Sequence, residues 1–222
     1  MPSFVADNSP ISTSIPAETG DLSGYQGYDH IHWYVGNAKQ AASYYITRFG
    51  FQHIAYKGLE TGSRYISSHV VGNGDVRFVL TSAIQQSDKQ ASDVPVTELG
   101  SSLQDIYAHL DKHGDSVKDV AFEVDDVRSL YSKAVESGAK SVKAPTTVSD
   151  DSGEILYAIV KTYGDTTHTL LQRNNYHGAF LPGYRAVTAV DPIQAFLPKV
   201  PLAVIDHCVG NQDWNQMEEM CD

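Results

Sequence analysis

The side chains most able to bind a metal in this 222-residue chain are histidines, and two of its nine histidines share a local context. His30 follows Asp29 in "YDHIHWYVGN", and His207 follows Asp206 in "AVIDHCVGNQDW"; a Gly-Asn pair ends the apolar run in both segments. Two histidines and one carboxylate from three strands can hold a non-haem iron and leave positions open for substrate and dioxygen. Whether such a site forms therefore depends on which other ligand residues lie near each histidine.

Around the first histidine, the candidate metal ligands are His30, Asp119 and Thr169. Asp119 lies 89 positions after His30, in a strand that repeats the first one, and Thr169 lies in the last strand of that repeat. His30 and Asp119 can bind a metal, but a threonine hydroxyl is a poor ligand. We therefore expect this part of the chain to be structural, with His30 hydrogen-bonded in the core or at its rim.

The other histidines form weaker patterns. His30 and His32 make an H-x-H element that supplies two ligands on one strand face, but no third ligand is near in sequence. If the chain binds iron in this region, His30, His32 and Asp119 are the residues to test. His109 and His113 are four positions apart in "HLDKH", which lacks the glutamate of a metalloprotease helix and favours a solvated helix face. No partner pattern surrounds His53, His69, His168 or His177.

The elements that must position these side chains occur twice. Asn37 can cap a helix that ends at Gly50, and Asp126, 89 positions after Asn37 (126 − 37 = 89), can cap one that ends at Gly138. The two helices bury equivalent apolar positions: Ala38, Ala41, Ala42, Tyr45 and Ile46 in the first, and Val127, Leu130, Tyr131, Ala134 and Val135 in the second. The chain therefore contains an internal repeat.

Each helix lies between strands in a βαβββ unit. Alternating or apolar runs predict strands at 29–35, 51–57, 64–71 and 76–81, and then at 119–124, 141–143, 154–162 and 168–172. We expect an α+β fold in which the two units, 25–82 and 103–175, form one curved mixed sheet with helices on its outer side and a concave inner face. The polar stretch 82–102 is expected to be an exposed loop or linker, and 103–112 a helix.

A third unit starts near the end of the sequence. After a proline-containing connector, 176–201, a strand is expected to begin at residue 202, and Asp213 can cap a helix with Trp214 on it. The last three strands of this unit are absent from the sequence, so we expect 202–222 to be the truncated start of a second domain and poorly anchored.

Composition excludes several classes of function. The net charge is −11, and nucleic-acid binding needs clustered Lys and Arg. No apolar stretch is long enough to span a membrane, and two cysteines are too few for a disulfide framework. Residues 1–24 are expected to be a disordered tail rather than a signal peptide. We expect a reduced, cytoplasmic protein.

Three segments carry a resemblance to a known family. The segments "GYDHIHWYVGNAKQAASYYITRFGFQHIAYKGLETGSR", "VKDVAFEVDDV" and "IDHCVGN" resemble the fungal-type 4-hydroxyphenylpyruvate dioxygenases, and the resemblance runs from about Gly24 to the end. It implies the vicinal-oxygen-chelate fold of the glyoxalase and bleomycin-resistance superfamily, with an N-terminal domain that is not catalytic and a C-terminal domain that holds Fe(II) through two histidines and a glutamate. In this sequence His207 matches the first iron ligand, and Val209 matches a residue lining the substrate pocket.

The resemblance also implies a reaction: conversion of 4-hydroxyphenylpyruvate and O2 to homogentisate and CO2 in tyrosine catabolism, by a homo-oligomer that is commonly a dimer or a tetramer, with a dimer expected here. The second histidine and the glutamate would lie beyond Asp222. A lone imidazole cannot retain Fe(II) against water, so the chain by itself is expected to be inactive.

Two other functions remain open. Residues 25–175 can form a non-catalytic vicinal-oxygen-chelate module that binds a ligand or dimerises through its concave face, or the chain can be a fragment of 4-hydroxymandelate synthase, a relative that uses the same substrate. The missing half would discriminate the synthase from the dioxygenase. Stoichiometric iron bound by this chain would point instead to a site near His30.

Overall fold

The computed structural model describes residues 24–84, 95–161, 164–211 and 214–215. The first unit of the sheet consists of β1 (Tyr25–Tyr34), α1 (Ala38–Phe49), β2 (Gln52–Lys57), β3 (Ile66–Asn73) and β4 (Val76–Ala83). The second consists of β5 (Ser116–Val124), α3 (Val127–Glu136), β6 (Lys140–Asp150), β7 (Gly153–Lys161) and β8 (Thr167–Gln172). Shorter elements are η1 (Leu59–Thr61), α2 (Leu103–His113), β9 (Arg185–Ala186) and η2 (Pro192–Phe196). The expected tail lies outside the described residues except for Gly24, as does the helix expected after Asp213 except for Trp214 and Asn215.

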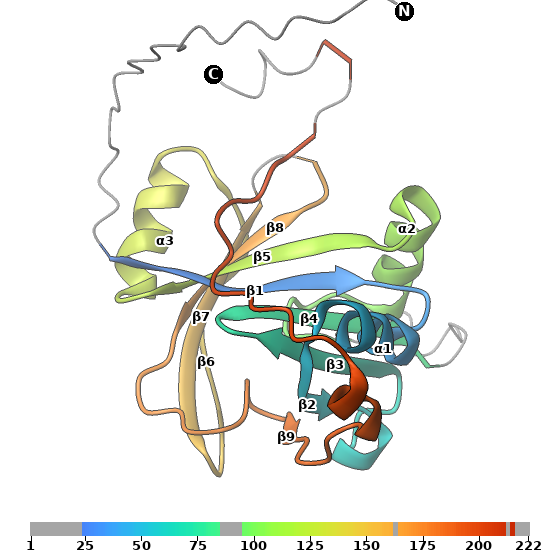
Figure 1. Ribbon diagram of the computed structural model, residues 1–222. Helices are drawn as coiled ribbons and strands as arrows, with labels where there is room; N and C mark the ends of the chain where they lie inside the picture. Colours follow the sequence, from blue (N-terminus) through green and yellow to red (C-terminus); the bar gives the residue numbers. More distant parts are fainter. Residues whose placement is uncertain (1–23, 85–94, 162–163, 212–213, 216–222) are drawn as a thin grey trace, which may run out of the picture.

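The two units join edge to edge in one mixed sheet of nine strands, with the order β6-β7-β8-β5-β1-β4-β3-β2-β9 (Figure 1). In each unit the first strand pairs in parallel with the last, and β1 meets β5 in antiparallel pairing. Ile31 faces Val120 across this junction, and the two are 89 positions apart. The pair therefore lies on a local two-fold axis that relates the units, and the predicted α+β repeat is confirmed.

The repeated helices cover the outer face of the sheet. At the start of α1, the Asn37 side chain accepts a hydrogen bond from the backbone N–H of Gln40, and Asp126 accepts two in the same way at the start of α3. Strand side chains alternate between faces, so those next to each other in sequence separate into two layers. The outer layer under α1 contains Phe51, Val71, Val76 and Leu80, and that under α3 contains Val124, Leu156, Ala158 and Leu170.

The inner face is largely filled instead of being an open concavity. Helix α2 packs Leu103 and Ile106 into the same core cluster as Tyr34 of β1. Phe180 and Tyr184 enter this cluster from the segment after β8, which the sequence assigns to a connector. The inner face is therefore closed by segments outside the repeat.

Two predicted strands differ from the structure. Strand β6 extends from Lys140 to Asp150, because it is an edge strand in which Pro145 is tolerated and mostly exposed positions hide the usual alternation. The strand expected from residue 202 is wrong: residues 202–211 form neither helix nor strand. The Asp75 N–H donates to the Ala203 carbonyl at 2.7 Å, but this single bond does not extend into the ladder that a stable strand needs. No helix among the described residues has the length and apolarity needed to cross a membrane.

Candidate functional site

The polar residues singled out by the sequence lie in two neighbouring rows on the inner face of the sheet. In one row, His30 of β1 faces Ala121 of β5, which in turn faces Thr169 of β8. In the next row, His32 faces Asp119, which faces Thr167. The sheet therefore brings together His30, Asp119 and Thr169, the three candidate positions, together with His32.

His30 is held by a buried ion-pair network. Its Nδ1 lies 2.6 Å from Oδ1 of Asp29, and Asp29 is also bound by the Arg173 guanidinium, with Nη2 2.7 Å from Oδ2. Burial alone would raise the pKa of Asp29, but hydrogen bonds and charge from His30 and Arg173 hold that pKa well below its usual value. An ionised carboxylate only accepts hydrogen bonds, so Nδ1 of His30 carries a proton and donates it. In the neutral imidazole, Nε2 is then an acceptor.

His32 is also engaged by the protein. Only 2% of its surface is exposed, and its Nε2 lies 2.8 Å from the Thr81 hydroxyl, which in turn lies 2.7 Å from the Ser68 hydroxyl. Burial lowers the pKa of His32 to about 3, so this imidazole is neutral at pH 7. His30 and His32 are thus buried, hydrogen-bonded histidines, as expected for a structural role of this region.

Asp119 and Thr169 each have an unused polar atom. The Thr167 hydroxyl donates to Oδ1 of Asp119 at 2.6 Å, whereas Oδ2 has no hydrogen-bond partner within the described parts of the chain. Burial raises the pKa of Asp119. The Thr169 hydroxyl is likewise buried and forms no hydrogen bond of normal geometry in those parts, although its proximity to the Asp119 carboxylate offsets part of this rise in pKa.

The inner face does not fit a resident iron. The third position is Thr169, whose hydroxyl is a poor ligand, and Nε2 of His32 contacts the Thr81 hydroxyl. Across the residues that the structure describes, no three His, Cys, Asp or Glu side chains are arranged to hold a metal ion.

A cavity of about 230 Å³ lies over these rows. His30, His32 and Thr169 line it on the sheet side, and its walls are mostly apolar: Val79, Ile155, Leu171, Phe180 and Leu181. The walls come from both units and from the segment after β8. The cavity is thus formed by the joined units, and neither unit has it alone.

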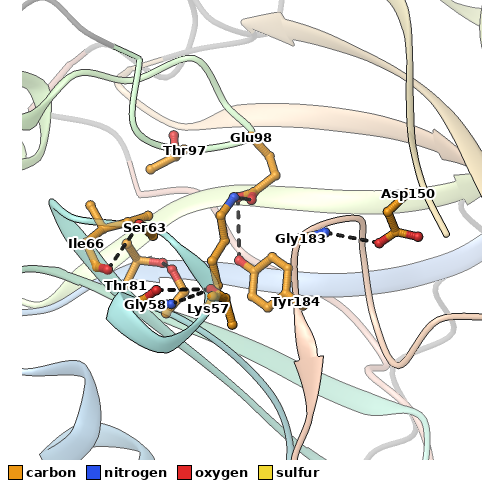
Figure 2. A network of polar contacts seen from close by, with 12 residues as sticks. Lys57, Gly58, Ser63, Ile66, Thr81, Thr97, Glu98, Asp150, Gly183 and Tyr184 are labelled. Atoms are coloured by element: carbon orange, nitrogen blue, oxygen red, sulfur yellow. Dashed lines mark hydrogen bonds and ion pairs between the residues drawn. The ribbon is translucent and has the colours of Figure 1, made fainter. Parts of the chain in front are cut away.

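Glu98 lies at the polar end of this cavity, where it contacts Lys57 and Tyr184 (Figure 2). Its carboxylate forms an ion pair with Lys57 of β2 and lies 3.5 Å from the Tyr184 hydroxyl, while its backbone carbonyl accepts from Tyr157 of β7 at 3.1 Å. Burial would raise the pKa of Glu98, but Lys57 holds it below its usual value. Next to Tyr184, the Gly183 N–H donates to Asp150 of β6, which anchors the segment after β8 (Figure 2).

The sequence did not identify this polar end. Residues 82–102 were expected to be an exposed loop or linker, but in the described part Leu99 and Thr97 are buried against the inner face. The segment folds inward because Leu99 joins the core and Lys57 neutralises Glu98. The polar composition of 82–102 does not predict this burial. The feature of the sequence that favours it is the apolar Leu99 next to the acidic Glu98.

His207 and Val209 lie apart from the cavity. The His207 side chain is 71% exposed, and its Nδ1 lies 2.7 Å from Oδ2 of Asp206. Val209 is 75% exposed and lines a groove with Ile31 and Val120, whose side chains point to the outer face of the sheet. The segment that carries both predicted site residues therefore crosses the side of the sheet opposite the cavity.

Four of the remaining histidines have side-chain partners. The Nε2 of His53 lies 3.1 Å from Nδ1 of His69. His109 lies 2.8 Å from the Ser116 hydroxyl, and His113 lies 3.0 Å from Asp165. The solvated face expected for His109 is wrong: this side chain is only 7% exposed, because it points toward Tyr34 in the core.

Comparisons with known proteins agree with this architecture. The family model described as the Glyoxalase/Bleomycin resistance protein/Dioxygenase superfamily matches residues 27–172. The chain is 58% identical over 218 residues to a 4-hydroxyphenylpyruvate dioxygenase from Aspergillus fumigatus, covering 96% of this chain and 54% of that protein. It is 57% identical over 204 residues to the enzyme of that name from Yarrowia lipolytica, covering 91% and 49%. The chain thus spans about half the length of the curated relatives it matches.

Solved structures show the same fold. A mutant of 4-hydroxymandelate synthase from Streptomyces coelicolor matches with a TM-score of 0.59 and 26% identity, over 79% of this chain and 45% of that one. Methylmalonyl-CoA epimerase from Mycobacterium tuberculosis matches with a TM-score of 0.50 and 15% identity, over 71% and 94%. The second likeness concerns the fold alone.

Proposed function

Because the chain belongs to the Glyoxalase/Bleomycin resistance protein/Dioxygenase superfamily, we propose that it forms part of a 4-hydroxyphenylpyruvate dioxygenase. This enzyme would convert 4-hydroxyphenylpyruvate and O2 to homogentisate and CO2 in tyrosine catabolism. The observation that carries the proposal is the 51–58% identity to five fungal proteins of that name. The identity to the Streptomyces synthase is 26%, so the synthase is the weaker candidate.

Residues 25–175 would serve as the non-catalytic domain, followed by the connector 176–201. The support for this role is chemical: Thr169 stands where a third ligand is needed, and the Nε2 atom of His32 contacts the Thr81 hydroxyl. The task of this domain would be to support the catalytic domain. Residues 202–222 would belong to that catalytic domain.

His207 would be an iron ligand of that domain, and Val209 would line its substrate pocket. The contact between Nδ1 of His207 and Asp206 supports the first assignment, because metal-binding histidines usually donate their other ring N–H to a carboxylate or carbonyl group. Fe(II), when bound by a full set of ligands, would supply the oxidative chemistry. The described residues supply one such ligand, so the chain alone is expected to be inactive.

A chimera tests the proposal directly. The chain would be joined to the remaining half of the Aspergillus fumigatus relative, and homogentisate formation from 4-hydroxyphenylpyruvate would be measured with Fe(II) and ascorbate. We expect turnover by the chimera, at least a hundredfold loss in its His207→Ala variant, and no turnover by the unmodified chain. A folded chimera without activity, or an active His207→Ala chimera, would contradict the proposal.

We also propose a cytoplasmic homodimer. The support is the resemblance to a homo-oligomeric family together with the net charge of −11, which favours solubility. Sedimentation velocity of the chimera would test the dimer.

A further inference from the structure

We propose that the cavity on the inner face binds a small, neutral phenol or a comparable single-ring aromatic alcohol. This goes beyond the dioxygenase function, which gives residues 25–175 no ligand of their own and places catalysis near His207. The cavity lies on the opposite side of the sheet from the His207 segment.

The first argument is the unused hydroxyl of Thr169. This residue is only 6% exposed and lines the cavity, and its Oγ1 forms no hydrogen bond of normal length and angle in the residues that the structure describes, although it interacts with the Asp119 carboxylate and offsets part of the rise that burial causes in the pKa of that group. A buried hydroxyl without a partner is costly, and such groups usually have one. A ligand in the cavity would provide it.

The second argument is the ring of His30, which lies in the same row as Thr169 and lines the cavity. Asp29 holds a proton on Nδ1, which leaves Nε2 for a ligand, and in a neutral imidazole Nε2 is an acceptor. Strand β5 lies between the strands of His30 and Thr169, and its residue in this row is Ala121, whose side chain is only a methyl group. Neighbouring strands are about 4.8 Å apart, so the Cα atoms of His30 and Thr169 are roughly 10 Å apart. A ligand hydroxyl between them can donate to His30 and accept from Thr169.

The third argument is the charge of the cavity. Lys57 and Glu98 form an ion pair with each other, so neither offers an uncompensated charge to a ligand (Figure 2). His32 is neutral at pH 7. An anionic ligand would therefore lose its hydration without meeting a free cation from the lining, which disfavours carboxylates.

The fourth argument is size and shape. An apolar cavity of about 150 Å³ is enough to hold benzene. The present cavity, of about 230 Å³, has room for one ring with one or two small substituents. Its walls include Phe180, whose ring lies 5.0 Å from that of His30 and can pack against an aromatic ligand.

The experiment uses the full chain and three probes of similar size, with binding measured by calorimetry and by amide chemical-shift changes. 4-Methylphenol carries the hydroxyl, toluene lacks it, and 4-methylbenzoate replaces it with a charge. We expect 4-methylphenol to bind, toluene to bind at least tenfold more weakly, and 4-methylbenzoate to show no binding. Equal affinity for toluene, tighter binding of 4-methylbenzoate, or no binding of 4-methylphenol by the folded chain would overturn the proposal.

The Thr169→Val variant provides the matched test of the hydrogen bond. Valine keeps the shape of threonine and removes only the unused hydroxyl, so the melting temperature should be unchanged or higher. We expect the affinity for 4-methylphenol to fall about tenfold, which corresponds to about 1.4 kcal/mol, with the affinity for toluene unchanged. Thr147→Val, at an exposed position of β6, is the control and should leave both affinities unchanged. An unchanged affinity for 4-methylphenol in a folded Thr169→Val chain would contradict the site. Since this assay contains no iron and no turnover, its failure is distinguishable from failure of the dioxygenase proposal.

Discussion

His32 and Asp119 face each other across the junction of β1 and β5, and burial favours the uncharged form of both. A histidine and an aspartate in adjacent positions would ordinarily be expected to form an ion pair. Here the imidazole contacts the Thr81 hydroxyl and the carboxylate accepts from Thr167. The centre of the sheet thus contains two titratable groups whose ionisation opposes folding, with opposite dependence on pH.

His32 should make the protein sensitive to mild acid. Its pKa is about 3 in the folded chain and about 6.5 when unfolded, so the unfolded state binds the additional proton. The stability contributed by neutral His32 is therefore present at pH 7 and is lost as the pH falls below about 6.5 toward 3. From pH 7 to pH 5 the loss should be about 2 kcal/mol. His69 and His109, whose pKa values are lowered to about 4, add to it.

Urea unfolding of a His32→Gln variant at pH 7 and pH 5 measures this contribution. The variant should lose about 2 kcal/mol less than the original chain over that interval. Thr81→Val is the matched control: it removes the contact but keeps the buried imidazole, so the pH dependence should persist. An equal acid loss in His32→Gln would show that His32 is not the source.

Asp119 should have the opposite effect. Its folded-state pKa is raised, so the ionised carboxylate destabilises the native state once the pH exceeds about 3.9, the value in the unfolded chain, and the penalty is absent below it. We expect Asp119→Asn to raise the free energy of unfolding at pH 7 by about 1 kcal/mol, because the amide keeps the acceptor for Thr167 without the charge. The gain should disappear near pH 4.

Chemical denaturation at both pH values checks this prediction, with the exposed Asp151→Asn as the control for a lost surface charge. A loss of stability in Asp119→Asn at pH 7 would mean that the carboxylate has a cationic partner in solution.

Arg173 should be needed for the buried charge of Asp29. Asp29 is fully buried at its side chain, and Arg173 is 19% exposed. Removing the guanidinium leaves the carboxylate with the hydrogen bond from His30 as its remaining side-chain contact in the described chain. We expect Arg173→Met to cost about 3 kcal/mol at pH 7. Arg128→Met, at an exposed position of α3, should cost less than about 0.5 kcal/mol.

The cost of Arg173→Met should shrink in acid. The folded pKa of Asp29 is lowered, so its ionised form contributes stability above the unfolded pKa of about 3.9, and that contribution is lost as the pH falls through the folded value. A cost that stays constant between pH 7 and pH 3 would assign the effect to lost packing of the Arg173 side chain.

The repeat could be predicted from sequence because local signals carry it. Asn37 and Asp126 cap helices with the same apolar spacing, and the strand that holds Asp119 repeats the one that holds His30. These signals depend on neighbours in the chain. These local signals were sufficient to predict the repeated units and to place His30, Asp119 and Thr169 on the inner face of the sheet.

The cover of the inner face could not be predicted in the same way. Glu98 is turned inward by Lys57, 41 positions earlier, and Tyr184 reaches the same carboxylate from 86 positions later. Such contacts exist only after the sheet has formed. The strand expected from residue 202 failed for a related reason, because an apolar run becomes a strand only where a neighbouring edge pairs with it.

The iron content of the purified chain tests the central claim, that the inner face of residues 25–175 is a metal-free scaffold. The chain and its Asp119→Asn variant would be loaded anaerobically with Fe(II), desalted and analysed by mass spectrometry for metals. We predict that both retain well below one iron per chain, because Thr169 stands at the third position and the described residues offer no set of three His, Cys, Asp or Glu ligands. One iron per chain that is lost in Asp119→Asn would contradict the account.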